Sequence, residues 1–355
     1  MSETSTLTAG LLERLATGPV ICGEGYLFEL ERRGYLQAGG FVPEVVLEHP
    51  EEVSTLHREF VHAGSDVVEA FTYYAHREKL RVIGQLDLLE PMNRQALRLA
   101  AQVARETGTL LAGNVCNSTM FDPADPATAA QVREMFDEQI GWAVEAGVDF
   151  VVGETFSYLE EASLALASIR ATGLPSVVTL AVHQEPRTRD GFSLIDACRR
   201  LEDEGADVVG VNCARGPATM LPLLGSLVAA VSVPVAALPV PYRTTNEQPT
   251  MQSLRDPASG SERAFPTALD PFTCNRYEIA EFTEAAAELG VRYLGLCCGA
   301  APHHLRAMAE ALGRRPGASR YSEDMSRHVY FGTSTELRRH NLEYGRRFST
   351  QASDH

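Results

Sequence analysis

The sequence lacks the marks of a membrane or secreted protein. None of the apolar runs in its 355 residues approaches the length of a membrane span. The first residues, Met1 to Leu7, have neither the basic start nor the apolar core of a secretory signal. The seven cysteines are an odd number spread over a long chain, which does not match a disulfide framework. We therefore expect a cytoplasmic protein whose thiols stay reduced.

Basic charge is also scarce. The chain has 31 Lys and Arg against 47 Asp and Glu, which gives a formal net charge of −16. This balance argues against nucleic acid or an anionic membrane surface as a partner. No Gly-x-Gly-x-x-Gly motif follows the first apolar run, so the sequence gives no support for a dinucleotide-binding sheet.

Apolar content, in contrast, is ample, and it is arranged in a repeating order. Eight short runs rich in β-branched residues lie at 19–22, 66–71, 109–113, 149–152, 176–180, 207–213, 234–238 and 292–297. Between most of them are Ala-, Leu- and Glu-rich stretches of helical length, for example 91–107, 127–146, 160–172 and 276–289. Near-continuously apolar strands that alternate with helices predict a parallel (β/α)8 TIM barrel. An open doubly wound sheet is the alternative.

A recurring glycine supports the barrel. Gly64, Gly147, Gly205 and Gly290 each stand between the end of a helical stretch and the second, fourth, sixth or eighth apolar run. A left-handed glycine commonly ends a helix and turns the chain into the next element. Its fourfold recurrence favours a barrel over an open sheet.

Two stretches depart from this order. Residues 242–273 are long, polar and rich in Pro, Thr and Ser, which predicts either a lid or a disordered insertion. The barrel should be complete within residues 1–316, which leaves 317–355 as a C-terminal extension. There a capping box from Thr333 to Glu336 predicts a helix that continues from Leu337 to Phe348 and could pack on the barrel or on a second subunit.

Three cysteines stand at the ends of two apolar runs. Cys213 ends the sixth run, and the adjacent Cys297 and Cys298 end the eighth. Adjacent side chains on a regular strand face opposite ways, so both sulfurs can serve one centre only where flanking glycines such as Gly299 let the backbone distort. Three thiolates suit a zinc ion whose fourth position is open to substrate. A vicinal disulfide and buried apolar cysteines are the alternatives.

Other reactive groups follow the same strand ends, where barrel enzymes gather their catalytic side chains. Glu24 and Glu154 would be carboxylates that face the metal, or else helix caps or surface acids. Tyr73, Tyr74 and Phe41 could surround a cation with aromatic faces, or could belong to the core.

These residues resemble a known family, the homocysteine S-methyltransferases, and within it the betaine–homocysteine methyltransferases. The resemblance runs from Val20 to Leu312, and its most specific parts are 210–213 and 295–299, with further similar stretches at 28–35, 48–51, 56–60 and 63–66. It implies a (β/α)8 barrel in which Cys213, Cys297 and Cys298 bind zinc and the homocysteine sulfur is the fourth ligand. Asn212, next to Cys213 in the first motif, is expected in the substrate site.

The resemblance also suggests which residues contact the substrates. Glu24 stands one position away from the Asp with which the family contacts the homocysteine amino group, and Glu154 matches a second carboxylate of that site. Around the methyl donor the betaine enzymes have a Tyr and a Trp where this chain has Thr155 and Phe41, whereas the strand-two Tyr is kept as Tyr74.

The implied reaction is zinc-dependent methyl transfer from glycine betaine, or a related onium donor, to homocysteine, which yields methionine and dimethylglycine. A sulfonium such as S-methylmethionine or dimethylsulfoniopropionate, or proline betaine, is the alternative donor. Transfer from methyl-folate through a corrinoid is disfavoured because the chain has no room for the extra domains. A zinc- or thiol-responsive binding protein is the alternative that is not an enzyme. We expect a homo-oligomer.

Overall fold

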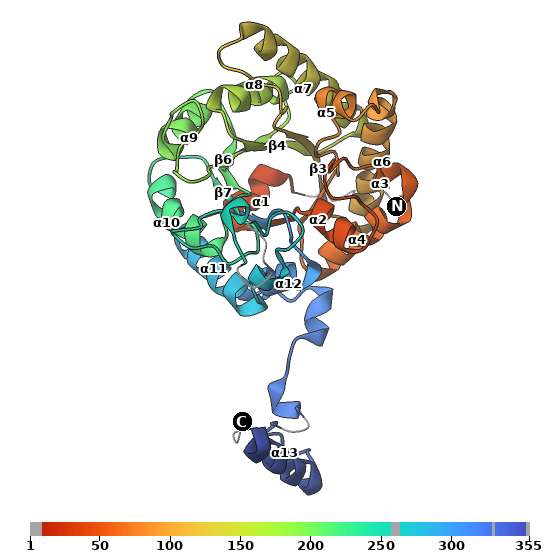
Figure 1. Cartoon of the computed structure of the whole chain (residues 1–355), viewed down its shortest axis with the longest axis vertical. Coiled ribbons are helices and arrows are strands. Elements are labelled where there is room, and N and C mark those ends of the chain that lie inside the picture. The colour runs from red at the N-terminus through yellow and green to blue at the C-terminus, as the bar shows by residue number, and fades with distance from the viewer. Residues whose placement is uncertain (1–8, 257–262, 329–330, 353–355) are drawn as a thin grey trace, which may run out of the picture. The chain divides into compact units, whose positions relative to one another are not determined.

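The computed structural model describes residues 9–256, 263–328 and 331–352. Its sheet is a closed barrel of parallel strands in sequence order, with β8 paired to β1, and the helices form a ring around it (Figure 1). The strands are β1 Val20–Gly23, β2 Val67–Glu69, β3 Leu110–Cys116, β4 Phe150–Phe156, β5 Ser176–Leu180, β6 Val208–Asn212, β7 Val235–Leu238 and β8 Tyr293–Leu296. The predicted (β/α)8 barrel is confirmed, and the open sheet was the wrong alternative.

Helices α6, α7, α8 and α11 agree with the stretches predicted at 91–107, 127–146, 160–172 and 276–289 to within about two residues at each end, which is the usual uncertainty of helix boundaries. The bounds of all the helices follow. They are α1 Leu11–Thr17, α2 Tyr26–Arg32, α3 Val45–Glu48, α4 Pro50–Ala63, α5 Arg77–Val82, α6 Leu89–Thr107, α7 Pro126–Ala146, α8 Leu159–Arg170, α9 Leu194–Asp203, α10 Pro217–Val228, α11 Arg276–Glu288, α12 Pro302–Ala311 and α13 Arg339–Ala352. The glycines predicted to end helices, Gly64, Gly147, Gly205 and Gly290, all have positive φ, between 76° and 119°.

Two apolar layers build the barrel unit. Alternate strand residues form one cluster inside the barrel, for example Val20, Val152 and Tyr293, and Leu11 and Leu15 of α1 join this cluster. The strand residues between them pack outward against the helices. Helix α1, which lies in the middle of the ring in Figure 1, therefore closes one end of the barrel.

The inward-facing layer turns polar at the carboxyl ends of the strands. Because inward positions recur every second residue, Ala112 is followed by Asn114, Val152 by Glu154 and Gly210 by Asn212. The polar members of this layer are all buried. Strand periodicity alone thus brings an amide, a carboxylate and another amide together at one end of the barrel.

The long segment after β7 folds over that same end. An isolated antiparallel bridge pairs Tyr242 with Thr273 at its base, and the described part of the segment contains the short 3₁₀ helices η2 Met251–Ser253 and η4 Asp270–Phe272. Part of the predicted lid or insertion, 257–262, lies outside the described residues. The described part is packed, since Met251, Leu254 and Leu269 are buried.

The chain forms two compact units, Met1–Gly317 and Ala318–His355. In the second unit the structure corrects the predicted start of the helix, because α13 begins at Arg339 rather than after the capping box. The Ser334 hydroxyl accepts the N–H of Glu336, only two residues on, and the Leu337 N–H donates to the Ser334 carbonyl. These bonds close a local turn in place of a helix N-terminus.

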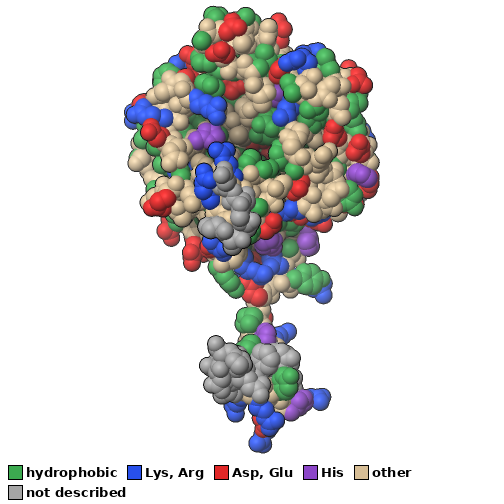
Figure 2. All heavy atoms as spheres, viewed as in Figure 1, with side chains coloured by type: hydrophobic (Ala, Val, Ile, Leu, Met, Phe, Trp, Pro, Cys, Tyr) green, Lys and Arg blue, Asp and Glu red, His purple; other side chains and the backbone are tan. Residues whose placement is uncertain are grey.

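The surface carries both signs of charge. On the face of the barrel unit shown in Figure 2, acidic and basic side chains are interspersed. Among the described residues, no helix is both long enough and apolar enough to cross a membrane.

Candidate active site

Three thiols meet at the carboxyl end of the barrel. The Sγ atom of Cys298 lies 3.8 Å from that of Cys213 and 3.9 Å from that of Cys297, and all three sulfurs lie within 4.8 Å of one another. None of the three is in a disulfide. Zinc–sulfur bonds of about 2.3 Å in a tetrahedral arrangement place the sulfurs about 3.8 Å apart. The spacing of these thiols therefore fits a zinc ion.

The backbone around the thiols is distorted, as the adjacency of two cysteines requires. Cys213 and Ala214 have φ of 56° and 54°, and Gly299 has φ of 95°. A positive φ is uncommon for residues other than glycine, and such strain concentrates at functional sites. Thr155 and Tyr74, at φ of 62° and 61°, extend the strained set along neighbouring strand ends.

A buried tyrosine supports the loop that carries Cys297 and Cys298. The Tyr242 hydroxyl accepts a hydrogen bond of 2.8 Å from Arg32 Nη2, and Arg32 Nη1 donates to the Gly299 carbonyl at 3.3 Å. A Cβ on Gly299 would overlap the Tyr242 hydroxyl oxygen and lie 2.7 Å from its Cζ. Only glycine therefore lets the ring close over this turn.

Carboxylates lie directly beside the thiols. Carboxylate oxygens of Glu24 and Glu154 lie within 4.8 Å of the Cys297 sulfur and of each other. Asn114 Nδ2 donates to Glu154 at 2.7 Å and to a third buried carboxylate, Glu69, at 2.5 Å. Neither oxygen of Glu24 has a hydrogen-bond partner in the described part of the chain. An unpartnered buried carboxylate is costly, so this corner favours either protonation of the carboxyl group or a bound cation.

Burial and mutual repulsion shape the charge of this corner. Burial, followed by repulsion from Glu154 and Glu69, raises the pKa of Glu24 well above its usual value. Burial also raises the pKa of Glu154 to about 7. In the described residues, the hydrogen-bond partners of Glu69 and Glu154 are amides, a hydroxyl and a thiol, with no Lys or Arg. A bound cation would return both groups to the ionised form.

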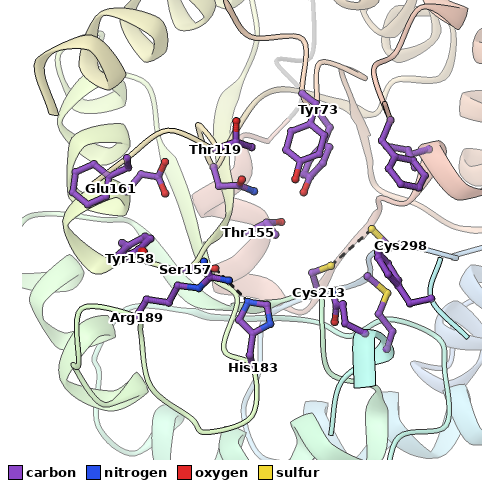
Figure 3. A pocket seen from close by; sticks show the side chains of 18 of the residues that line it. Tyr73, Thr119, Thr155, Ser157, Tyr158, Glu161, His183, Arg189, Cys213 and Cys298 are labelled. Atoms are coloured by element: carbon purple, nitrogen blue, oxygen red, sulfur yellow. Dashed lines mark hydrogen bonds between the residues drawn. The ribbon is translucent and has the colours of Figure 1, made fainter. Parts of the chain in front are cut away.

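A cavity of about 510 Å³ opens on the other side of the thiols (Figure 3). Cys213, Cys298 and Thr155 lie in its wall, and Phe41 and Tyr74 contribute aromatic rings. A smaller pocket behind it is lined by Glu24, Glu154 and both adjacent cysteines, and it shares Cys298 and Tyr73 with the larger cavity. The thiols therefore stand where a narrow acidic pocket meets a wide aromatic one.

The aromatic walls are arranged in pairs. Tyr73 and Tyr74 have ring centroids 4.4 Å apart, and Phe41 stacks on Phe28 at 5.7 Å. The Lys79 ammonium lies 4.5 Å from the Tyr74 centroid, so one face of that ring already carries a cation.

The residues singled out from the sequence thus fall around one centre. Asn212 lines neither pocket; its Nδ2 donates to Glu154 at 2.7 Å and lies 3.9 Å from the Cys297 sulfur, and its Oδ1 accepts the Thr155 N–H at 3.0 Å. Thr155 in turn donates its hydroxyl to Glu154 at 3.0 Å. The other eight all line one or both pockets.

Sequence reasoning overlooked several lining residues. Glu69 is a charged residue inside an apolar strand, a signal that could have marked it. Tyr158, His183, Arg189 and Phe265 also line the large cavity, but they belong to loops and helix starts whose paths the sequence pattern does not reveal.

The fold and the site together define a (β/α)8 barrel with a cluster of three thiols at the carboxyl ends of β6 and β8. Comparison with known proteins identifies its kind: the family model for homocysteine S-methyltransferase matches residues 21–312. The chain belongs to the homocysteine S-methyltransferase family and is an S-methyltransferase, which confirms the resemblance drawn from the sequence.

Individual relatives agree with this assignment. Betaine–homocysteine S-methyltransferase 1 of Danio rerio is 36% identical over 334 residues, covering 92% of this chain and 81% of the relative. The S-methylmethionine–homocysteine S-methyltransferase BHMT2 of Mus musculus is 33% identical over 321 residues, covering 87% and 82%. The crystal structure of the homocysteine methyltransferase MmuM from Escherichia coli, metallated form, has the same fold, with a TM-score of 0.64 at 17% identity over 82% of this chain and 96% of that one.

Proposed function

We propose that this enzyme transfers a methyl group from an onium donor, glycine betaine first, to the sulfur of L-homocysteine, and that it does so with zinc bound by Cys213, Cys297 and Cys298. The observation that carries the proposal is the meeting of these thiols at the junction of an acidic and an aromatic pocket. When bound, zinc lowers the pKa of a coordinated thiol so that homocysteine is held as a thiolate at neutral pH.

The acidic pocket would hold the homocysteine ammonium group. Glu24 has two unpartnered oxygens there, and Glu154 is held in place by the amides of Asn114 and Asn212. These amides orient the carboxylate before substrate arrives, which reduces the cost of binding. The ammonium group would complete the hydrogen bonding of Glu24 and offset the repulsion between the two carboxylates.

The aromatic pocket would hold the donor. The rings of Tyr73, Tyr74 and Phe41 offer π-faces to a cation and exclude water from the methyl group. A new bond forms between the homocysteine sulfur and the methyl carbon, while the bond from that carbon to the onium atom breaks and leaves its electron pair on the departing neutral amine or sulfide. No proton has to be supplied, so the task of the protein is alignment.

A sulfonium donor is the second candidate. Where the betaine enzymes have a Tyr ring, Thr155 offers only a hydroxyl that is bound to Glu154, so the cavity is wider on that side. One relative is named for transfer from S-methylmethionine. Glycine betaine ranks first because the sequence resemblance to the betaine enzymes extends over most of the chain.

The proposal is tested by metal analysis together with methionine formation from homocysteine and each donor. We expect zinc in the purified protein, and we expect Cys213→Ser, Cys297→Ser and Cys298→Ser each to lose both zinc and turnover, because a hydroxyl is a poor substitute for a soft thiolate. Cys198→Ser is the matched control, since Cys198 is also a free, buried thiol but lies in α9, outside the thiol cluster. Full activity in any of the three ligand variants would refute the zinc assignment.

We also propose that the enzyme is a homo-oligomer and that the unit Ala318–His355 takes part in its assembly. Within that unit Met325 and Phe331 expose 56% and 55% of their surface, an arrangement that a second chain could cover. Light scattering on the full chain and on a chain that ends at Gly317 tests this, and an unchanged mass per particle would count against it.

A further inference from the structure

The loop after β5 brings a basic side chain to the wall of the large cavity. Within this loop the backbone folds into a tight hairpin, with a bridge between Arg187 and Ser193 and a left-handed Gly191 at φ of 92°. Arg189 stands at its tip. The backbone N–H of Arg189 donates to the Ser157 carbonyl at 2.7 Å, which ties the tip to the end of β4.

The base of the loop is held as firmly. The guanidinium of Arg215, which is buried after β6, donates to the carbonyls of His183 and Gln184 at 2.7 and 3.0 Å. His183 in turn forms a hydrogen bond of 3.3 Å with the Ser157 hydroxyl. The tip and the base of the loop are thus fixed before any ligand binds.

Arg189 forms no ion pair in the described ranges, although its charge partly offsets the rise in the pKa of the buried Glu161 nearby. No carboxylate there lies within ion-pair distance of its guanidinium, whose Cζ lies 6.0 Å from the centroid of the Tyr158 ring. The neighbouring Asp190 is engaged, since its carboxylate accepts the N–H groups of Leu159 and Glu160. The guanidinium is therefore available to an anion that enters the cavity.

The other described residues of the cavity wall include no Lys or Arg. Glu161 is the carboxylate of the wall, and it already accepts the N–H and the hydroxyl of Ser118 at 2.7 and 2.5 Å. Burial and the nearby Arg189 lower the pKa of His183, so its ring is neutral at pH 7. Among the described residues that line the large cavity, Arg189 is thus the one Lys or Arg.

The position of Arg189 suits a ligand with charge at both ends. In Figure 3 the Arg189 side chain reaches toward Ser157 and His183 on one side of the pocket, whereas Cys213 and Cys298 lie on the other side and Tyr73 lies at the top of the view. A cation that approaches the thiols is held by the aromatic rings. A negative group on the same molecule has to lie away from the thiolates, and the far wall presents Arg189 to it.

We propose that Arg189 determines donor specificity by binding the carboxylate of the methyl donor, so that the donor is an onium acid rather than a simple onium ion. This inference rests on the proposed function. The planar guanidinium matches a carboxylate with two parallel hydrogen bonds. The Ser157 hydroxyl and the neutral His183 ring form the polar wall beside this contact.

Matched pairs of donors test the inference. Dimethylsulfoniopropionate is compared with trimethylsulfonium, and glycine betaine with tetramethylammonium, so that each pair shares its onium atom and differs in the carboxylate. For each compound kcat/KM is measured, or the inhibition constant where turnover is too slow. The variants are Arg189→Gln, Arg189→Lys and the matched control Arg187→Gln, whose side chain binds the Gly191 carbonyl and does not line the cavity.

We expect Arg189→Gln to lower kcat/KM for the donors with a carboxylate by about tenfold to a hundredfold through a higher KM, which is the range of a hydrogen bond to a charged group. The values for the compounds without a carboxylate should stay within about twofold of the wild type. For the donors with a carboxylate, the kcat/KM of Arg189→Lys should lie between that of the wild type and that of Arg189→Gln, and Arg187→Gln should match the wild type. An equal loss for both members of a pair, or no loss for either, overturns the role of Arg189 while methionine still forms. Failure to form methionine with any donor would instead overturn the proposed function.

Discussion

Replacement of Gly299 by alanine tests how the thiol-bearing loop is supported. The added Cβ would meet the hydroxyl and ring of Tyr242, which is fully buried and held by Arg32, so the ring has little room to move. Gly299 also has φ of 95°, where an L-residue is strained whatever the space around it. Both effects act on the turn that directly follows Cys297 and Cys298.

The two effects can be separated with a matched variant. Gly290 has φ of 100°, close to that of Gly299, but its added Cβ would meet only Val228 Cγ1 at 3.3 Å. Gly290→Ala should therefore show the backbone strain alone, of about 1–2 kcal/mol. Gly299→Ala should lower the free energy of unfolding by a further amount of about 1–3 kcal/mol, because the added Cβ overpacks the site.

The loss at Gly299 should appear in metal binding as well as in stability. Supporting residues behind metal ligands typically change metal affinity by about 10- to 100-fold, and we expect a loss in that range for Gly299→Ala and none for Gly290→Ala. Zinc affinity is measured by competition with a chromophoric chelator, and unfolding by urea with and without zinc. Tyr242→Phe removes the overlapping oxygen, so the double variant should recover part of the loss.

Equal behaviour of the two alanine variants in both assays would show that Tyr242 does not hold the loop. The same conclusion would follow if the effects of Gly299→Ala and Tyr242→Phe simply added.

Three further predictions concern the pockets and the core. Glu154→Gln places an amide nitrogen against the donating amide of Asn114 or Asn212 and removes the charge of the carboxylate. The KM for homocysteine should therefore rise by about 10- to 100-fold, while the zinc content is unchanged. Unaltered homocysteine kinetics would show that Glu154 has only a structural role. Thr155→Tyr adds a ring and should raise kcat/KM for glycine betaine relative to bulkier donors. Tyr74→Ala should lower kcat/KM for every onium donor, through a loss of about 0.5–2 kcal/mol of cation–π energy. Unchanged donor kinetics in Tyr74→Ala would show that the donor does not bind against this ring. Burial lowers the pKa of His57 to about 3, so below pH 6.5 the imidazole is protonated in the unfolded chain but stays neutral in the folded chain, and the unfolding free energy should fall by about 2 kcal/mol at pH 5. His57→Leu should reduce this dependence of the unfolding free energy on pH in urea titrations. An unchanged pH dependence in this variant would contradict the assignment.

Much of this enzyme could be predicted from local patterns. The apolar runs and the left-handed glycines predict the order and the ends of the strands, because strand and helix periodicities are local properties of the chain. In a barrel the carboxyl ends of all strands meet. Residues as distant in sequence as Cys213 and Cys298 could therefore be placed together before any contact was known.

Contacts between distant loops could not be predicted in the same way. That Tyr242 closes over Gly299, that Asn114 bridges Glu69 and Glu154, and that Arg189 lines the cavity all depend on side-chain packing across different strands and loops. The start of α13 was missed for a related reason: a capping-box sequence is compatible both with a helix start and with a local turn. The strand ends are set by short-range periodicity, whereas the loop paths and the free energies of their contacts exist only once the chain has closed into a barrel.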